Sequence, residues 1–487
     1  MRILLVEPPV RASDIATAVF ALPPPHHLER LGGALVADHD VRIFDMRIES
    51  DLAAQLESFE PDMVGCSCVA ANYDLARDVL RLAKGHNPET FTVIGGHHPS
   101  LVPDLCYDPY IDFVVVGEGE LTLRKLADVC EKRGAVEPVK GIAYKTARGE
   151  FRINPQRELM DLDDLPPVAR HLTEKYRKRK SYYRAGWRPI DCVISSRGCP
   201  HKCSFCGLWK VNHGCYRVRK PESIVDELDS ISEPYITFAD DNTLDHIRNV
   251  NRLVELIEER GVRKTFGFYG RVDTVVRHPH LVERLRKVGM KMLLMGLESC
   301  DQRALDSMNK RTSTESNRKA IEICRANGVE VVAYLIVDPR FDRGDFRRLS
   351  DYVAELKLTH PVFTILSPFP GTDLYEEVKH TLITDGFELI DFYHTVMPTK
   401  LPLDEFYTEF LDLYRKAYPL KNFLVSALKN RAVLTPRNLR LSLRFRKKML
   451  QLRSHHDLAS NRPPVEAGSL ALPVPLEVPG EPQMAGQ

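Results

Sequence analysis

Short apolar runs alternate with amphipathic stretches along the first 132 residues of the chain. The apolar runs have the length of buried strands, and the stretches between them repeat apolar residues at helical spacing. Strands regularly separated by helices favour a parallel, doubly wound sheet, which binds ligands at the carboxyl ends of its strands. The expected strands are 2–7, 41–45, 63–69, 91–95 and 113–116, and the expected helices are 27–37, 51–59, 73–85 and 121–132.

A second alternation of strands and helices follows between residues 191 and 378. It contains six apolar runs, so the pattern predicts a second α/β unit. Beyond residue 398 the pattern becomes helical, with an amphipathic segment at 404–418. The expected strands are 192–196, 235–239, 265–269, 291–296, 329–337 and 362–366, and the expected helices include 248–260, 281–288, 314–327 and 346–358.

Residues 136–190 connect the two alternations. Two short apolar runs around Ala147-Arg-Gly149 predict a β-hairpin at 141–154, and the stretch Asp161-Leu-Asp-Asp-Leu-Pro-Pro167 has the composition of a linker. The sequence therefore predicts an α/β protein with an N-terminal domain, a second α/β domain, a basic helical region and a tail rich in Pro, Ala, Gly and Glu that we expect to be disordered. Their predicted bounds are 1–135, 191–398, 399–458 and 459–487.

At 487 residues the chain is too long for a single ordinary core, which agrees with several domains. The net charge is only +1, so the chain as a whole has no general affinity for nucleic acid. Three of its eleven cysteines lie close together on one loop. Such a loop is not compatible with a secretory disulfide framework, so the cysteine content favours a reducing compartment. The first apolar run is too short for a signal peptide and no stretch is long enough to span a membrane, so we expect a cytoplasmic protein.

Three cysteines stand at intervals of four and three residues in the loop after the apolar run 191–196. Cys199, Cys203 and Cys206 would place three thiolates on one tight loop at the carboxyl end of a strand, which favours an iron–sulfur cluster. A zinc site is the alternative, and its fourth ligand could be His201 or Cys215. A cubane held by only three cysteines leaves one iron free, which implies chemistry rather than plain electron transfer.

The string Cys-x-x-x-Cys-x-Phe-Cys, with Phe205 before the last cysteine, resembles the signature of the radical S-adenosylmethionine enzymes. The resemblance implies that Cys199, Cys203 and Cys206 hold a 4Fe-4S cluster whose free iron binds S-adenosylmethionine. Reductive cleavage would then give a 5'-deoxyadenosyl radical, with an electron donor such as a flavodoxin or ferredoxin. The resemblance also implies that the six β/α units at 191–398 form the partial barrel of that family.

Small and polar residues gather at the carboxyl ends of the N-terminal strands. Paired glycines there allow a bulky ligand to approach the backbone closely. The order Gly-Gly-x-His, then Asp-x-Val-Val-x-Gly-Glu-Gly-Glu, ahead of the cysteine loop, resembles the cobalamin-binding domain of the B12-dependent radical S-adenosylmethionine class. The resemblance implies that Ser67, Gly95, Gly96 and Glu118 contact cobalamin, and that the nucleotide tail of cobalamin runs into the sheet near the first three of them.

The chain departs from one type of cobalamin domain. It lacks the string Asp-x-His-x-x-Gly, whose histidine ligates cobalt from below in domains of the methionine synthase type. Members of the radical class commonly lack this string too, so the resemblance still implies cobalamin. We expect the cofactor in its base-off form, in which the base of its nucleotide tail does not bind cobalt. No lower cobalt ligand is assigned, and His97 and His98 are expected to be polar loop residues.

Three acidic residues occupy places where the radical family binds S-adenosylmethionine. Asp240 and Asp241 follow the second barrel strand, where the family holds the amino group, although its usual Gly-Gly-Glu is replaced here. Capping of the following turn is their alternative role. Glu298 follows the fourth strand and resembles the carboxylate with which the family contacts the ribose.

A radical generator beside a methyl-carrying corrin implies methyl transfer to an unactivated carbon, with the cofactors supplying the chemistry and the protein positioning them. The resemblance implies that one S-adenosylmethionine methylates cobalamin and that a second yields the radical that takes a hydrogen from the substrate. The chain length and the stretch 356–371 look most similar to the hopanoid C-3 methylases, which implies a lipid substrate. The alternative is a cyclase or rearrangement enzyme without methyl transfer, similar to the anaerobic magnesium-protoporphyrin ester cyclases.

The segment 421–456 carries ten Lys or Arg and no Asp or Glu, interleaved with apolar residues. A basic amphipathic helix of this kind can lie on an anionic bilayer, so we expect peripheral membrane contact. The same composition could bind RNA or dock on the protein itself. These alternatives remain open, although no nucleic-acid partner is expected for the chain as a whole.

Overall fold

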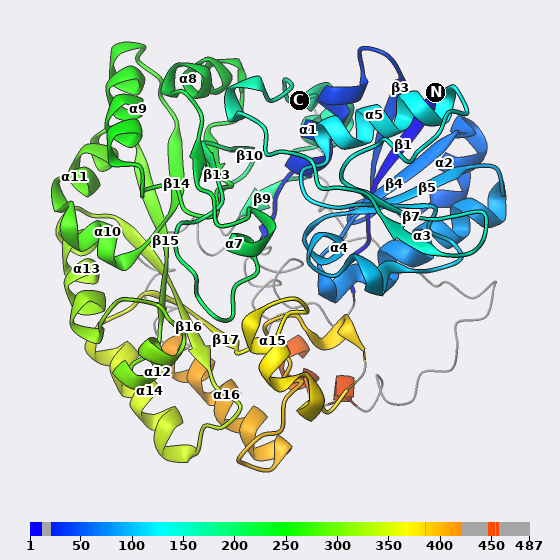
Figure 1. Cartoon of the computed structure of the whole chain (residues 1–487). Helices are drawn as coiled ribbons and strands as arrows, with labels where there is room; N and C mark the ends of the chain where they lie inside the picture. Colours follow the sequence, from blue (N-terminus) through cyan, green and yellow to red (C-terminus); the bar gives the residue numbers. More distant parts are fainter. Residues whose placement is uncertain (12–20, 185, 385, 420–446, 453, 457–487) are drawn as a thin grey trace, which may run out of the picture.

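The structure is a computed structural model that describes residues 1–11, 21–184, 186–384, 386–419, 447–452 and 454–456. An N-terminal α/β unit lies beside a larger, curved α/β unit, and the connecting segments run between them (Figure 1). The expected fold class, with a parallel sheet followed by a partial barrel and a helical C-terminal region, is confirmed.

The N-terminal sheet has seven strands in the order β3-β1-β4-β5-β6-β7-β8, and the first five are parallel. Because alternate side chains of a strand point to opposite faces, two apolar cores form, one on each face. Helices α2 and α3 cover one core and α1 and α5 cover the other. The bounds are β1 (Arg2–Glu7), β3 (Asp40–Asp45), β4 (Met63–Ser67), β5 (Phe91–Gly95), β6 (Phe113–Val115), α1 (His26–Leu35), α2 (Leu52–Phe59), α3 (Tyr73–His86) and α5 (Glu120–Glu131).

The expected hairpin in the connecting segment forms, and it extends the N-terminal sheet. Strand β7 (Ile142–Lys145) pairs antiparallel with β6, and β8 (Phe151–Ile153) pairs antiparallel with β7. The hairpin therefore occupies the open edge of β6. A second short pair, β2 (Ala21–Leu22) with β9 (Tyr183–Arg184), joins the N-terminal unit to the segment that enters the barrel.

The second unit is a sheet of six parallel strands in the order β10-β13-β14-β15-β16-β17, with its helices on the convex side (Figure 1). The first and last strands do not pair with each other, so the barrel is partial. The strands are β10 (Ile190–Val193), β13 (Tyr235–Phe238), β14 (Thr265–Gly270), β15 (Met290–Glu298), β16 (Glu330–Val337) and β17 (His360–Ile365). The covering helices are α8 (Pro221–Ser230), α9 (Ile247–Glu259), α10 (Val272–Arg277), α11 (Pro279–Lys287), α13 (Thr314–Ala326), α14 (Arg343–Glu355) and α16 (Leu403–Ala417).

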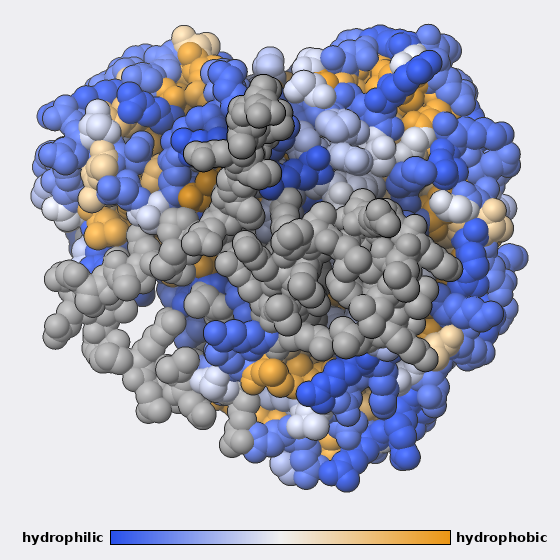
Figure 2. All heavy atoms as spheres, turned by 180° about the vertical axis from the view of Figure 1, so that it is seen from behind, coloured by the Kyte–Doolittle hydropathy of each residue, from blue (hydrophilic) through white to orange (hydrophobic). Residues whose placement is uncertain are grey.

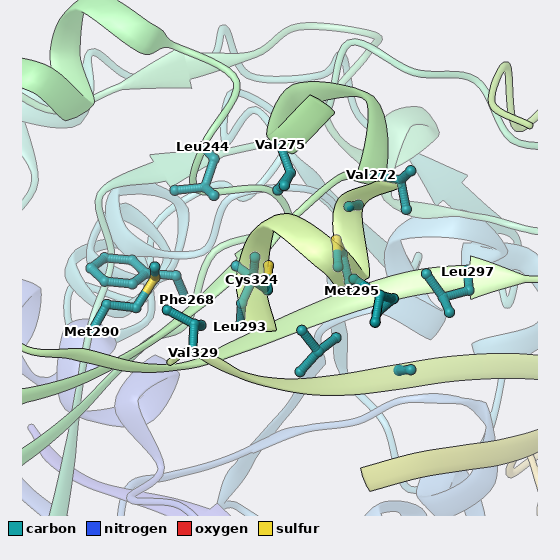
Figure 3. Close-up of a cluster of buried hydrophobic side chains, with 14 of the residues drawn as sticks. Leu244, Phe268, Val272, Val275, Met290, Leu293, Met295, Leu297, Cys324 and Val329 are labelled. Atoms are coloured by element: carbon teal, nitrogen blue, oxygen red, sulfur yellow. The ribbon is translucent and has the colours of Figure 1, made fainter. Parts of the chain in front are cut away.

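Each barrel strand presents one set of side chains to the helices and the other set to the inside. Met290 and Met295 of β15 pack with Phe268 and Cys324 in the core between strands and helices (Figure 3). Met292 of the same strand points the other way and lines a cavity. Met290 and Met292 face opposite sides although they are two residues apart, because the pairing of β14 with β15 shifts register between them. Beyond this shift, the strand side chains alternate between a helix-side core and an inner face for ligands.

Buried charges tie the connecting segment to both units. The Asp191 carboxylate, at the start of β10, accepts hydrogen bonds from Arg170 Nε at 2.7 Å and lies 2.9 Å from Arg177 Nη1. Arg177 also reaches Glu29 of α1, with 2.6 Å between Nη2 and Oε1. Glu29 and Asp191 are fully buried, so each depends on these guanidinium partners for compensation of its charge.

Part of the basic C-terminal segment docks on the barrel. Met449 and Leu452 are buried in the core of the barrel unit, and His456 hydrogen-bonds to the Tyr407 hydroxyl at 2.8 Å. The alternative of docking on the protein therefore holds for these residues, whereas most of the predicted segment 421–456 and the predicted tail 459–487 lie outside the described residues.

The described surface seen in Figure 2 is mainly hydrophilic, with apolar side chains in scattered patches. Among the helices that the structure describes, none combines the length and the apolar composition needed to cross a membrane.

Candidate active site

A cavity of about 1100 Å³ lies between the two units and continues along the inner face of the partial barrel. Residues at the carboxyl ends of both sheets line it, including Ser67 and Gly96 from the N-terminal sheet and Ala239 and Asp241 from the barrel. Both parallel sheets thus present their ligand-binding edges to one space. Its volume exceeds that of an ordinary small-molecule pocket, which suits bulky cofactors together with a substrate.

At the cavity wall, the loop after β4 and the loop after β5 lie in close contact. Gly96 has a φ of +107°, and a Cβ at this position would overlap the Cys68 carbonyl oxygen and lie 2.9 Å from Ser67 Oγ. The Cys68 amide in turn donates to the Gly95 carbonyl at 2.9 Å. Ser67, Gly95 and Gly96 therefore form one stretch of wall with little side-chain bulk, which fits the close approach of the nucleotide tail of cobalamin.

We expect Gly96→Ala to lower the affinity for hydroxocobalamin by about tenfold or more, because a Cβ at this positive φ forces the loop to shift. The measurement is an absorbance titration of the purified protein. Gly85→Ala is the matched control, since Gly85 lies near the end of α3 and no heavy atom lies within 4 Å of its Cβ position. Equal affinities of the two variants would show that this stretch of wall does not hold cobalamin.

The two histidines after the glycine pair have different surroundings. His97 lines the cavity, whereas His98 is buried and packs against the rings of Tyr73 and Phe387, with centroids 5.1 and 4.9 Å away. Burial lowers the pKa of His97, against the effect of Asp241, and lowers the pKa of His98 to about 4, so the His98 imidazole is neutral near pH 7. His98 is a packing residue, and of the two only His97 reaches the cavity.

The cysteine loop, residues 199–206, is held by backbone contacts from three directions. Gly198, with a φ of +86°, begins the loop, and its amide donates to Asp241 Oδ2 at 2.8 Å. The Ser204 amide donates to the Met308 carbonyl at 3.1 Å, and the Leu374 amide donates to the Ser204 carbonyl at 3.1 Å. Segments after β15 and β17 thus fix a loop that follows β10.

The three thiols lie on this held loop, with Cys203 buried and Cys199 and Cys206 half-buried. Burial raises the pKa of Cys206 to about 12, and Cys203 and Cys199 contribute to this rise. Cations at such a site favour thiolates and offset this penalty. The donor set and its enclosure therefore fit an iron–sulfur cluster.

No three His, Cys, Asp or Glu side chains within the described part of the chain converge on a point that could hold a single metal ion. A cubane does not require such convergence, because each cysteine binds a different iron. The alternative zinc ligands are placed elsewhere: His201 Nε2 lies 2.9 Å from Asp245 Oδ2, and Cys215 is exposed. The geometry thus favours the cluster over the zinc alternative.

The two aspartates after β13 play different parts. Asp240 is buried and does not line the cavity; its Oδ1 accepts the amide of Ser195 at 2.7 Å and that of Ser196 at 3.0 Å. Burial raises the pKa of Asp240 to about 6, against the effect of these donors. Asp241 reaches the cavity and holds Gly198. Asp241 is therefore the better placed of the two for an ammonium, while Asp240 shapes the chain that enters the cysteine loop.

Glu298 and Phe205 lie on the barrel side of the cysteine loop. Glu298 is buried at the end of β15 and pairs with Lys310, with 2.5 Å between Oε1 and Nζ. Phe205 packs against a small apolar cluster that includes Met308 and Leu366. Neither is among the residues that line the cavity, so their contacts with S-adenosylmethionine remain predictions.

Glu118 lines the cavity, and it also links the glycine-rich loop of the N-terminal unit to the cysteine loop. Its Oε1 lies 2.8 Å from Arg197 Nη1 and 2.7 Å from Arg217 Nη2. The pKa of Glu118 lies below its usual value, because these two guanidiniums outweigh the effect of burial. Glu120 pairs with Arg197 as well. The Gly-Glu-Gly-Glu motif thus serves as a bridge between the two cofactor-binding loops.

Sequence reasoning did not identify Arg197, Arg217 or Lys310 as parts of the site. A signal existed for Arg197, because a basic residue just before the cysteines matches the two glutamates of the Gly-Glu-Gly-Glu motif. No local signal marks Lys310, whose partner Glu298 lies twelve residues away in the sequence.

Comparisons with known proteins identify both units, the one that carries the glycine-rich loops and the one that carries the cysteine loop. The B12 binding domain family matches residues 18–127, and the Radical SAM superfamily matches residues 193–353. The chain is 32% identical over 470 residues to the hopanoid C-3 methylase of Methylococcus capsulatus, covering 92% of this chain and 89% of that protein.

Two solved structures share the fold. The cobalamin-dependent S-adenosylmethionine radical enzyme OxsB superposes with a TM-score of 0.70 at 18% identity, over 94% of this chain and 71% of that chain. The radical S-adenosylmethionine methyltransferase TsrM from Kitasatospora setae, with cobalamin and a [4Fe-4S] cluster bound, gives 0.67 at 16% identity, over 94% and 99%. The chain therefore belongs to the cobalamin-dependent radical S-adenosylmethionine methyltransferases, enzymes that use a 4Fe-4S cluster, S-adenosylmethionine and cobalamin.

Proposed function

We propose that this enzyme methylates an unactivated carbon of a lipid, with a hopanoid as the first substrate to test. The observation that carries the proposal is the apolar lining of the inner part of the cavity, where Met292, Val332 and Val362 point inward from three neighbouring strands. Burial of a large apolar body against them is favourable by about 25 cal/mol per Å². The name of the Methylococcus capsulatus relative, a hopanoid C-3 methylase, supports the same substrate class.

The bound groups would supply a 5'-deoxyadenosyl radical and a methyl group. The chain's own residues hold the space in which these meet: Gly95 and Gly96 form one wall and Asp241 fixes the start of the cysteine loop. The substrate carbon would lie between them, at the junction of the two sheets. Enclosure by both units would keep the reactive intermediate away from other molecules and limit side reactions.

We infer that a flavodoxin or ferredoxin supplies the electron and that the enzyme works in the cytoplasm. The basic residues of 421–446 would contact an anionic membrane from which a lipid substrate is taken. The docked residues Met449 and Leu452, which follow this segment, would keep it attached to the barrel.

The test uses anaerobically purified protein with a reconstituted cluster, reductant, S-adenosylmethionine, hydroxocobalamin and a lipid extract. We expect both 5'-deoxyadenosine and S-adenosylhomocysteine to form, with the second product dependent on hydroxocobalamin. Mass spectrometry of the extract should then show one lipid heavier by a methylene unit.

The products separate the alternatives. Formation of 5'-deoxyadenosine without S-adenosylhomocysteine, in the presence of bound cobalamin and extract, would favour a cyclase or rearrangement reaction. Formation of S-adenosylhomocysteine with a water-soluble fraction but not with the lipid fraction would contradict the lipid substrate and leave the methylation intact.

A further inference from the structure

The inner face of the partial barrel carries a polar group at its centre. Every second residue of the strands lines the cavity here, and most of these side chains are apolar or small. The larger polar side chains along the strands are Tyr269 of β14 and Tyr334 of β16, together with Arg184, which enters from β9 of the connecting segment. Glu330 and His360 also line the cavity, at the amino ends of β16 and β17, where they lie 3.6 Å from each other. A cationic side chain therefore points into a lumen that is lined mainly by apolar and small side chains.

Arg184 is held at this place by the segment that closes the bottom of the barrel. Its backbone exchanges hydrogen bonds with Trp187, whose ring stacks on Tyr235 with centroids 5.5 Å apart and lies against Gly267. Its guanidinium lies beside Tyr269, with 3.4 Å between Nη2 and the phenolic oxygen. Arg184 is thus half-buried and lines the cavity.

Arg184 has no carboxylate partner within ion-pair distance among the residues that the structure describes. Other arginines enclosed between the two units each have one: Arg177 pairs with Glu29 and Asp191, and Arg197 pairs with Glu118 and Glu120. Taking a charge out of water without a counter-charge is unfavourable. A guanidinium that lines a binding cavity with no carboxylate partner among the described residues indicates that a ligand provides the counter-charge.

Two neighbouring groups add donors to the same place. Burial and Tyr269 raise the pKa of Tyr334 to about 12, although the adjacent Arg184 lowers it, so Tyr334 stays a neutral O–H donor. Thr237 of β13 lines the cavity beside Cys192, and its Oγ1 is buried with no hydrogen-bond partner in the described structure. Unpaired buried hydroxyls are costly and are expected to be satisfied by a ligand.

We propose that Arg184, Tyr269 and Tyr334 form a subsite inside the barrel lumen for an anionic oxygen group of the substrate, a carboxylate or a phosphate. The proposal rests on the proposed function and adds a polar anchor to the apolar substrate. The planar fork of Arg184 would bind two oxygens of such a group, while the two phenols donate to it from the sides. The substrate is then an amphiphile whose head lies deep in the barrel.

The test measures ligand preference by isothermal titration of the full chain loaded with its cluster, cobalamin and S-adenosylmethionine. The probes are adamantane-1-carboxylate, adamantane-1-phosphonate and the neutral adamantane-1-carboxamide. We expect the wild-type protein to bind one of the two anions about tenfold or more tightly than the amide. Arg184→Gln should abolish this preference, and Tyr334→Phe should reduce it several-fold by removing one donor.

Arg179→Gln is the matched control, because Arg179 lies on the same segment but its side chain is 63% exposed. It should keep the full preference for the anion. A wild-type protein that binds the amide as tightly as both anions, or that binds none of the probes, would overturn the subsite.

Loss of cobalamin or S-adenosylmethionine from Arg184→Gln, with the anion preference intact, would assign the guanidinium to a cofactor and also overturn the proposal. These readouts do not depend on turnover. Failure of the subsite is therefore distinct from failure of the proposed methylation, which would appear as missing S-adenosylhomocysteine in the assay with wild-type protein.

Discussion

Cys203→Ser is expected to lower the rate of 5'-deoxyadenosine formation by about a thousandfold or more, since the loss of one of three thiolates removes the anchor of an iron. Cys203 is the buried member of the set and lies on a loop fixed by the Ser204 contacts to Met308 and Leu374. Its replacement therefore removes a ligand without altering the surrounding backbone. The measurement is product quantification under reductant, together with the iron content after reconstitution.

The matched control is Cys215→Ser. Cys215 is exposed and lies nine residues beyond Cys206 in the same part of the chain. We expect this variant to keep the wild-type rate within about twofold, as is usual for an exposed side chain without a structural role. Full activity of Cys203→Ser, or an equal loss in Cys215→Ser, would contradict the assignment of the cluster ligands.

Asp191→Ala is expected to destabilise the protein by about 3–5 kcal/mol, the usual cost of removing one partner from a buried ion pair. The variant leaves Arg170 and Arg177 enclosed with one counter-charge fewer, at the junction of both units and the connecting segment. Urea unfolding followed by the fluorescence of the two tryptophans measures the change, because Trp187 closes the barrel and Trp209 follows the cysteine loop.

Glu174→Ala is the control for this prediction. Glu174 pairs with Lys178 one helical turn away, and the two side chains are 57% and 73% exposed. Solvent screens such a pair, so its loss is expected to change the free energy of unfolding by no more than about 0.5 kcal/mol. A small effect of Asp191→Ala, equal to that of the control, would show that the buried charges do not stabilise the contact between the units.

Periodicity and spacing were sufficient for the elements of the fold and for the N-terminal sheet, whereas the partial barrel was implied by the family resemblance. The five parallel strands of the N-terminal sheet and the six strands of the barrel were predicted within a few residues, because each is a local apolar run between turn residues. The cysteine loop was equally clear, since its three thiols are close in the sequence. The glycines at 95 and 96 were marked by their place after a strand, and their bare wall follows from backbone conformation alone.

Side-chain roles that depend on distant partners were not predictable. Asp240 and Asp241 are adjacent and chemically identical, yet one holds Ser195 and Ser196 while the other faces the cavity. The hairpin at 141–154 was recognised, but only the tertiary structure decided that it extends the N-terminal sheet.

The sequence alone determined which elements form, their order and where three thiols lie together, because these depend on contacts between near neighbours along the chain. Tertiary structure decided that Glu118 meets Arg197 across 79 positions, and that Arg184 lies beside Tyr269 with no carboxylate within ion-pair distance in the described part of the chain. Electrostatic partners and cavity walls are set by the packing of one unit on the other, and no pattern within either unit encodes that geometry.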